Sequence, residues 1–124
     1  MEAKALATRV ADLALEKKGS DIQLLDIRGL SDVADFFVII SGESDVHVKT
    51  LANNISKSLR NDEGIRLLHK EGFIELKWVL LDYVDVVVHI FTPETRDHYA
   101  LEKLWADAKI TKVEDDATSA VISE

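Results

Sequence analysis

The chain contains no cysteine, and only one of its 124 residues is a proline. The lack of cysteine excludes disulfides, thiol nucleophiles and cysteine-based zinc sites, and it favours a reducing compartment. A single domain of this length buries roughly two thirds of the surface that its unfolded chain exposes, so it needs neither a disulfide nor a metal for stability. One domain with an ordinary hydrophobic core is therefore expected.

The sequence also lacks a continuous apolar segment near its start and a block of consecutive basic residues. Residues 1–18 mix charged with small apolar residues, unlike a signal peptide or a membrane span, so a cytoplasmic location is expected. With 15 Lys and Arg against 23 Asp and Glu, the net charge is −8, which would repel a phosphate backbone. The composition therefore favours a partner with a basic protein surface over direct nucleic-acid binding.

Hydrophobic spacing predicts an α/β (α+β) fold, in which helices pack on a mixed sheet of about five strands. Three helices are predicted. The first begins at Ala3, the second follows an N-cap at Ser44, and the third begins at Pro93, directly after Thr92. The first two end near Gly19 and Gly64, and the last carries a core stripe of Leu101, Leu104, Trp105 and Ala108. The predicted strands cover residues 22–27, 36–40, 65–68, 75–81 and 85–91. The predicted domain is residues 1–109, and residues 110–124 are expected to form a flexible acidic tail.

Trp78 is the residue with the sharpest choice of interpretation. On an alternating strand, Leu76, Trp78 and Leu80 share one face. Large aromatic residues are usually well buried, so ordinary core packing is one interpretation. The other is an exposed apolar strip beside acidic residues, which is the composition of a protein-binding hot spot that faces a basic partner.

A catalytic interpretation requires a phosphate-binding turn and carboxylates that share a strand face. Ser41 and Ser44 supply such a turn, because amides at a helix start attract anions. Asp82 and Asp85 are three residues apart, so they do not share a strand face. Glu43 and Asp45 lie at the predicted start of a helix, where carboxylates are favourable, so helix capping accounts for them. A magnesium-dependent nucleotide-processing enzyme is therefore kept only as the alternative, and no catalytic residue, cofactor or metal ligand is assigned.

The four histidines show no metal-binding spacing, and each is expected to face solvent or to be hydrogen-bonded. His89 interrupts the apolar run Val86–Ile90, so it needs a hydrogen-bond partner if it is buried. An internal hydrogen bond and a contact with a partner protein are both open interpretations for it.

Several motifs occur together in one order. They are DIQLLDIRGLSDVADFFVIISGESDVHVKTLA, then EG, a tryptophan, LLDYVDVVVHIF and TPETRDHYALEKLWADA. In this order they resemble the ribosomal silencing factor (Iojap) family, over most of the chain up to Ala108. The resemblance implies a nucleotidyltransferase-like fold without catalysis. It also implies docking on ribosomal protein number fourteen of the large subunit, a steric block to joining of the small subunit, damped translation, and homodimers when free.

The resemblance favours a partner-binding role for Trp78 and a set of residues around it. The candidate partner-binding residues are Glu71, Leu76, Trp78, Leu80, Asp82, Tyr83, Asp85, His89, Arg96 and Tyr99. The acids among them either form the negative rim of a docking face or are plain solvated loop acids. Arg96 either pairs at the surface with Asp97 or another acid, or ties its helix to the turn at Asp82 and Asp85. A homodimeric scaffold without ribosome binding is a third possible function.

One departure from the family pattern falls in the predicted hairpin turn. Where the family usually has Asp-Tyr-Gly-Asp or Asp-Leu-Gly-Asp, this chain has Val84 at the glycine position. Glycine would permit a positive φ, which a β-branched residue resists by roughly 1 kcal/mol or more. The turn is therefore expected to adopt another geometry or to carry strain, while the flanking strands survive.

Overall fold

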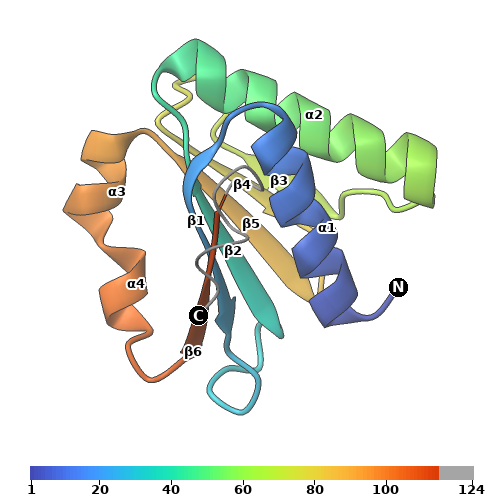
Figure 1. Cartoon of the computed structure of the whole chain (residues 1–124), viewed down its shortest axis with the longest axis vertical. Coiled ribbons are helices and arrows are strands. Elements are labelled where there is room, and N and C mark those ends of the chain that lie inside the picture. The colour runs from blue at the N-terminus through green and yellow to red at the C-terminus, as the bar shows by residue number, and fades with distance from the viewer. Residues whose placement is uncertain (115–124) are drawn as a thin grey trace.

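The computed structural model describes residues 1–114, in which one mixed sheet lies between two layers of helices (Figure 1). The six strands are ordered β3-β4-β5-β2-β1-β6, with β2 and β5 parallel and every other neighbouring pair antiparallel. The elements are α1 (Ala3–Glu16), β1 (Ser20–Asp26), β2 (Phe36–Ser41), α2 (Asp45–Glu63), β3 (His69–Glu71), β4 (Trp78–Asp82), β5 (Val86–Phe91), α3 (Pro93–Tyr99), α4 (Leu101–Leu104) and β6 (Lys109–Val113). The predicted mixed α/β fold is confirmed.

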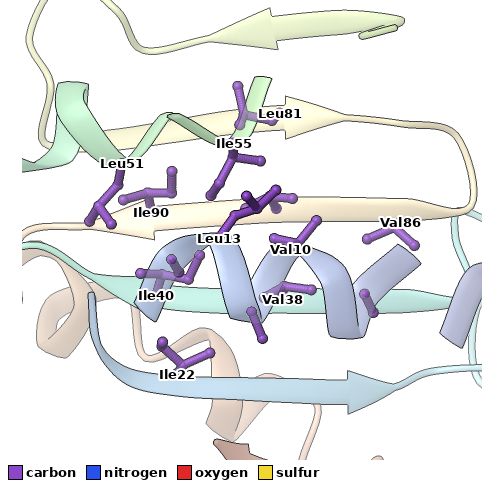
Figure 2. Packing of buried hydrophobic residues seen from close by; sticks show 14 of the residues in the cluster. Val10, Leu13, Ile22, Val38, Ile40, Leu51, Ile55, Leu81, Val86 and Ile90 are labelled. Carbon is purple, nitrogen blue, oxygen red and sulfur yellow. The ribbon is translucent and has the colours of Figure 1, made fainter. Parts of the chain in front are cut away.

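The central strands β2 and β5 are buried at every position, as their continuous apolar sequences predict. One face of the sheet packs under α1 and α2. Figure 2 shows the side chains of that layer over the sheet, among them Val10, Leu13, Leu51 and Ile55. This packing forms the larger hydrophobic cluster of the molecule and fixes the two central strands in place.

Two of the predicted helix boundaries have the expected chemistry. Ser44 is the N-cap of α2, where its side chain accepts a hydrogen bond from the His47 amide at 3.2 Å. Gly64 ends the same helix with a φ of 69°, a left-handed conformation that glycine adopts easily. Pro93 occupies the start of α3, whereas the Thr92 hydroxyl contacts the Thr95 hydroxyl at 2.9 Å and does not cap the helix within the described residues.

The last predicted helix is wrong as a single element, because it breaks at Ala100. Ala100 has a φ of 46°, and its amide closes α3 by donating to the Arg96 carbonyl. The chain then turns into α4, which keeps Leu101 buried but leaves Leu104 75% exposed. The expected core stripe therefore loses Leu104. The helical spacing of the apolar residues does not reveal this change of direction.

The region between α2 and β5 also differs from its prediction. The strand predicted at residues 65–68 lies later, as β3, and the strand predicted at residues 75–81 begins only at Trp78. Gly72 has a φ of 89°, and a Cβ there would lie 2.0 Å from the Trp78 carbonyl oxygen. The loop after β3 therefore passes so close to β4 that only glycine fits at this position.

The tail predicted from residue 110 is contradicted for its first part, because β6 pairs with β1 from Ile22↔Val113 to Asp26↔Lys109. Its side chains are mostly exposed, so no hydrophobic alternation marks it in the sequence. Backbone hydrogen bonding to the free edge of β1 specifies it instead. The sheet accordingly has six strands where about five were expected, and residues 115–124 lie outside the described part. Among residues 1–114, no helix has the length and apolarity needed to cross a bilayer.

Candidate docking surface

Trp78 is the first residue of β4. Its side chain lies on the sheet face that α3 and α4 cover only in part. Its indole is half-buried, and its ring centroid lies 4.8 Å from those of both Phe91 and Tyr99. The indole N–H donates to Nδ1 of His89 at 3.1 Å. The indole is therefore held on three sides while part of its surface stays accessible, which is intermediate between the two interpretations drawn from the sequence.

His89 lies under the indole on β5 and is only 5% exposed. Burial lowers the pKa of His89 to about 4, so the imidazole is neutral near pH 7. Because Nδ1 accepts from Trp78, the proton of the neutral ring sits on Nε2. Phe37 packs edge-on against the ring at 4.7 Å. His89 thus makes an internal hydrogen bond and supports Trp78 from below.

Leu80 and Glu71 extend the same face toward the edge of the sheet. The strand register pairs Glu71 with Leu80 and Leu80 with His89, which places these side chains on one side. Leu80 is half-buried, and Glu71 is exposed and lies 2.7 Å from His69 Nε2. An acid therefore borders the apolar face where the sequence predicted one.

Leu76 does not belong to this face, which corrects the predicted strip. It precedes β4, has a φ of 60°, and packs against the cluster under α1 and α2. The strand alternation that linked Leu76 to Trp78 does not apply, since the chain is in a loop until residue 78. The two side chains therefore lie on opposite sides of the sheet.

The loop before β4 supplies apolar residues that the sequence reasoning missed. Ile74 is 95% exposed, and with Phe73 it lines a groove of about 560 Å³ that also contains Trp78 and Tyr99. Tyr99 is 50% exposed. The signal in the sequence was two adjacent apolar residues inside a loop flanked by Gly72 and acids. We call Ile74, Trp78, Leu80 and Tyr99 the indole surface.

The hairpin turn at the other end of β4 lies far from Trp78. Asp82 pairs with Val87, whereas Trp78 pairs with Phe91, so the turn lies roughly four strand residues, or about 13 Å, away. Asp82 Oδ1 accepts the Val84 amide at 2.8 Å, and Val84 has a φ of 77°. The expected strain in this turn is therefore present.

Tyr83 and Asp85 are poorly placed for a contact beside the indole. Tyr83 is 6% exposed and packs into the cluster under α1 and α2, on the opposite side of the sheet, and burial raises its pKa to about 12. Asp85 accepts the amides of Asp35 and Phe36 through its backbone carbonyl, which fastens the turn to the loop before β2. The structure thus separates both residues from the indole surface.

Arg96 does pair with an acid other than Asp97, but the pair is largely buried and not at the surface, and it does not tie the helix to the turn at Asp82 and Asp85. Arg96 is 7% exposed, and it donates to Glu102 Oε2 at 2.7 Å and to Ser41 Oγ at 2.8 Å. The helix break at Ala100 brings Glu102 within reach of this guanidinium. Arg96 therefore joins α3, α4 and the end of β2, while Tyr99, three residues later, lies at the surface.

The turn that resembles a phosphate site is occupied by internal contacts. Ser44 caps α2, Ser41 accepts from Arg96, and Asp45 accepts from Lys77 Nζ at 2.8 Å. The Glu43 amide donates to His47 Nδ1 at 2.8 Å. These contacts support the helix-capping interpretation of this segment.

Comparison with known proteins places this geometry in a family. The family model described as "Ribosomal silencing factor during starvation" matches residues 1–123. The ribosomal silencing factor RsfS of Bacillus subtilis is 41% identical over 114 residues, covering 92% of this chain and 96% of that protein. The chloroplastic protein Iojap of Zea mays is 33% identical over 110 residues, and the match spans 46% of its length.

Solved structures agree with the sequence comparison. A crystal structure of a Chromobacterium violaceum protein is 32% identical, has a TM-score of 0.83, and covers 94% of this chain and 97% of its own. A Bacillus halodurans structure is 36% identical with a TM-score of 0.69, covering 89% of this chain and 94% of its own. On these matches in sequence and structure, the chain belongs to the ribosomal silencing factor family, RsfS.

Proposed function

We propose that this protein represses translation in the cytoplasm by binding the large ribosomal subunit through ribosomal protein number fourteen. Bound there, it blocks joining of the small subunit by its bulk. It acts as a binding protein and performs no chemistry of its own. Family membership supports the ribosomal role, and the mitochondrial relative from Mus musculus is named for assembly of the ribosomal large subunit.

The observation that carries the proposal is the fixed, half-exposed indole of Trp78. Interface hot spots are enriched in tryptophan and tyrosine that are held rigidly, because little side-chain entropy is then lost on binding. The indole N–H is already bonded to His89, so a partner meets an aromatic surface with its donor satisfied. Ile74 and Tyr99 add exposed apolar area beside it.

Charge indicates the kind of partner. The net charge of −8 favours a basic surface on the other protein and speeds association with it. Glu71 and Glu75 line the groove beside Trp78, together with Lys70 and Lys77. Lys77 is paired with Asp45, and Lys70 lies 4.7 Å from the Phe73 ring centroid. In this proposal Glu71 and Glu75, which lie beside Trp78, provide the acidic rim, and Asp82 and Asp85, at the other end of β4, do not.

We further propose that the free protein forms homodimers, as the family resemblance implies. Two copies can cover exposed apolar side chains that a monomer leaves in water. Light scattering after gel filtration measures the mass directly, and a monomer at all accessible concentrations would contradict this part of the proposal. Ribosome binding is tested separately, so the two parts can fail independently.

Co-sedimentation with isolated large subunits tests the docking proposal. Trp78→Ala should weaken binding by about 2 kcal/mol, or roughly thirtyfold, since it removes the central ring of the surface. Leu104→Ala is the matched control, because Leu104 is also apolar and exposed but lies on α4. It should bind like the unmodified chain.

A folded Trp78→Ala protein, verified by urea unfolding, that still binds at the original affinity would refute the docking site. Failure of the unmodified chain to co-sediment would favour the plain scaffold. Saturable, magnesium-dependent binding and turnover of a nucleoside triphosphate would favour the enzyme alternative. The three outcomes are distinguishable with the same protein preparation.

A further inference from the structure

A second hollow, separate from the indole surface, lies between β1 and the α3–α4 segment. Its volume is about 420 Å³, within the range of small-molecule sites. It opens beside Ser41, at the carboxyl end of β2, which is the end of a parallel strand where α/β proteins bind ligands. Its lining is Asp21, Gln23, Ser41, Pro93, Arg96, Asp97, Ala100, Glu102 and Lys103.

Arg96 gives the hollow a buried cationic wall. Two of its nitrogens are engaged, Nε with Glu102 and Nη1 with Ser41, and Nη2 makes no hydrogen bond among residues 1–114. A guanidinium has five N–H donors in a planar fork, so this one can bind a further oxygen pair. Lys103 lies on the same lining. This side of the hollow therefore suits a carboxylate.

The β1 side of the hollow has the opposite character. Gln23 Oε1 is buried, and among the described residues it accepts no hydrogen bond. Asp21, on this side, lies at an irregularity in the β1–β2 pairing and has a φ of 47°, while Asp97, on α3 next to Arg96, adds a carboxylate to the lining from the other side. Buried acceptors without a donor are costly, and bulges often direct side chains into sites. This side suits a group with several N–H donors and a positive charge.

We propose that the hollow binds a small zwitterion, namely a free α-amino acid. The ligand's carboxylate pairs with Arg96 and Lys103. Its ammonium group pairs with Gln23 Oε1 and the carboxylates of Asp21 and Asp97.

The charges of the lining distinguish this ligand from the alternatives. Three carboxylates, Asp21, Asp97 and Glu102, face two cations, Arg96 and Lys103. A phosphate would add negative charge to a site that already has an excess of it. A simple cation would leave Arg96 and Lys103 without a ligand partner, whereas a ligand with both an ammonium and a carboxylate group engages both kinds of side chain.

Titration of the isotope-labelled full chain followed by NMR tests the proposal. Each standard L-amino acid is added singly, and at least one should give saturable shifts of the Gln23 side-chain amide and Arg96 Nε–H, with a Kd of about 1 mM or tighter. The same amino acid with its carboxyl group amidated, or with its amine acetylated, should bind about tenfold more weakly or not at all. Inorganic phosphate should not compete.

Two variants locate the binding without disturbing the core. Asp97→Asn removes one proposed ammonium partner at an exposed position and should weaken binding about tenfold, whereas Asp12→Asn, an exposed acid on α1, should leave it unchanged. The proposal is overturned if no amino acid saturates, if the capped forms bind equally well, or if the two variants behave alike. Ribosomes are absent from this experiment, so its result is independent of the docking proposal.

Discussion

The hydrogen bond between Trp78 and His89 can be isolated by replacing each residue singly and both together. Trp78→Phe keeps an aromatic ring between Phe91 and Tyr99 but removes the N–H donor. His89→Leu substitutes an apolar side chain of similar size and removes the acceptor. The double variant has neither group, so the cycle reports the energy of the pair itself.

The structure sets the expected size of that energy. The donor and acceptor are both uncharged, because His89 is buried and its pKa is lowered to about 4. A neutral internal hydrogen bond contributes about 0.5–1.5 kcal/mol, and a buried partner left alone costs about 1–3 kcal/mol. Trp78→Phe should therefore be destabilised, whereas His89→Leu loses this bond but also removes the buried Nε2–H, which has no partner among the described residues; the coupling energy should be about 1 kcal/mol.

Urea unfolding of the four proteins near pH 7 measures the coupling. Strictly additive effects, with a coupling below about 0.3 kcal/mol, would show that the indole is not held by the imidazole. The same proteins can be co-sedimented with large subunits. His89 is only 5% exposed, so a loss of binding in folded His89→Leu would report the position of Trp78 and not a lost contact.

The other expectations concern acid stability and the strained turn. Burial lowers the pKa of His89 from 6.5 to about 4, so the unfolded chain takes up a proton at a higher pH than the folded protein does. The neutral, buried His89 therefore contributes about 3 kcal/mol to the free energy of unfolding above pH 6.5, and this contribution is lost as the pH falls toward 4. His89→Leu should flatten this part of the pH–stability curve, and an unchanged slope would contradict the burial argument. Val84→Gly should stabilise the fold by about 0.5–1 kcal/mol in thermal or urea unfolding, because relief of a left-handed β-branched residue exceeds the entropic cost of glycine. Val33→Gly, at an exposed valine without a positive φ, should be neutral or destabilising, and a gain there equal to that at Val84 would refute the strain.

The strands and helices that the sequence predicted well are those with a local signal. The apolar run of β2, the helical stripe of α2 and the caps at Ser44 and Gly64 each depend on residues close together in the chain. The same is true of the strained turn, since Val84 stands between Tyr83 and Asp85 in a hairpin. An accessible Trp78 was one of two interpretations drawn from the sequence; its side chain is half-buried, and the docking role stays a prediction.

The residues that were misplaced depend on contacts between distant segments. β6 exists because β1 offers a free edge, and Leu76 turns inward because the Gly72 loop crosses β4. Arg96 finds Glu102 only because α3 breaks at Ala100. No periodicity in the sequence records these pairings.

The sequence by itself determined the mixed α/β class and the acidic character, because short-range hydrophobic spacing and composition carry that information, and the order of its motifs carried the resemblance to the family. Only the tertiary structure decided which apolar side chains stay at the surface. It also decided that His89 supports the indole of Trp78 and that Glu102 neutralises the buried Arg96. Those outcomes depend on how distant segments pack, and packing is settled by the competition of all contacts at once.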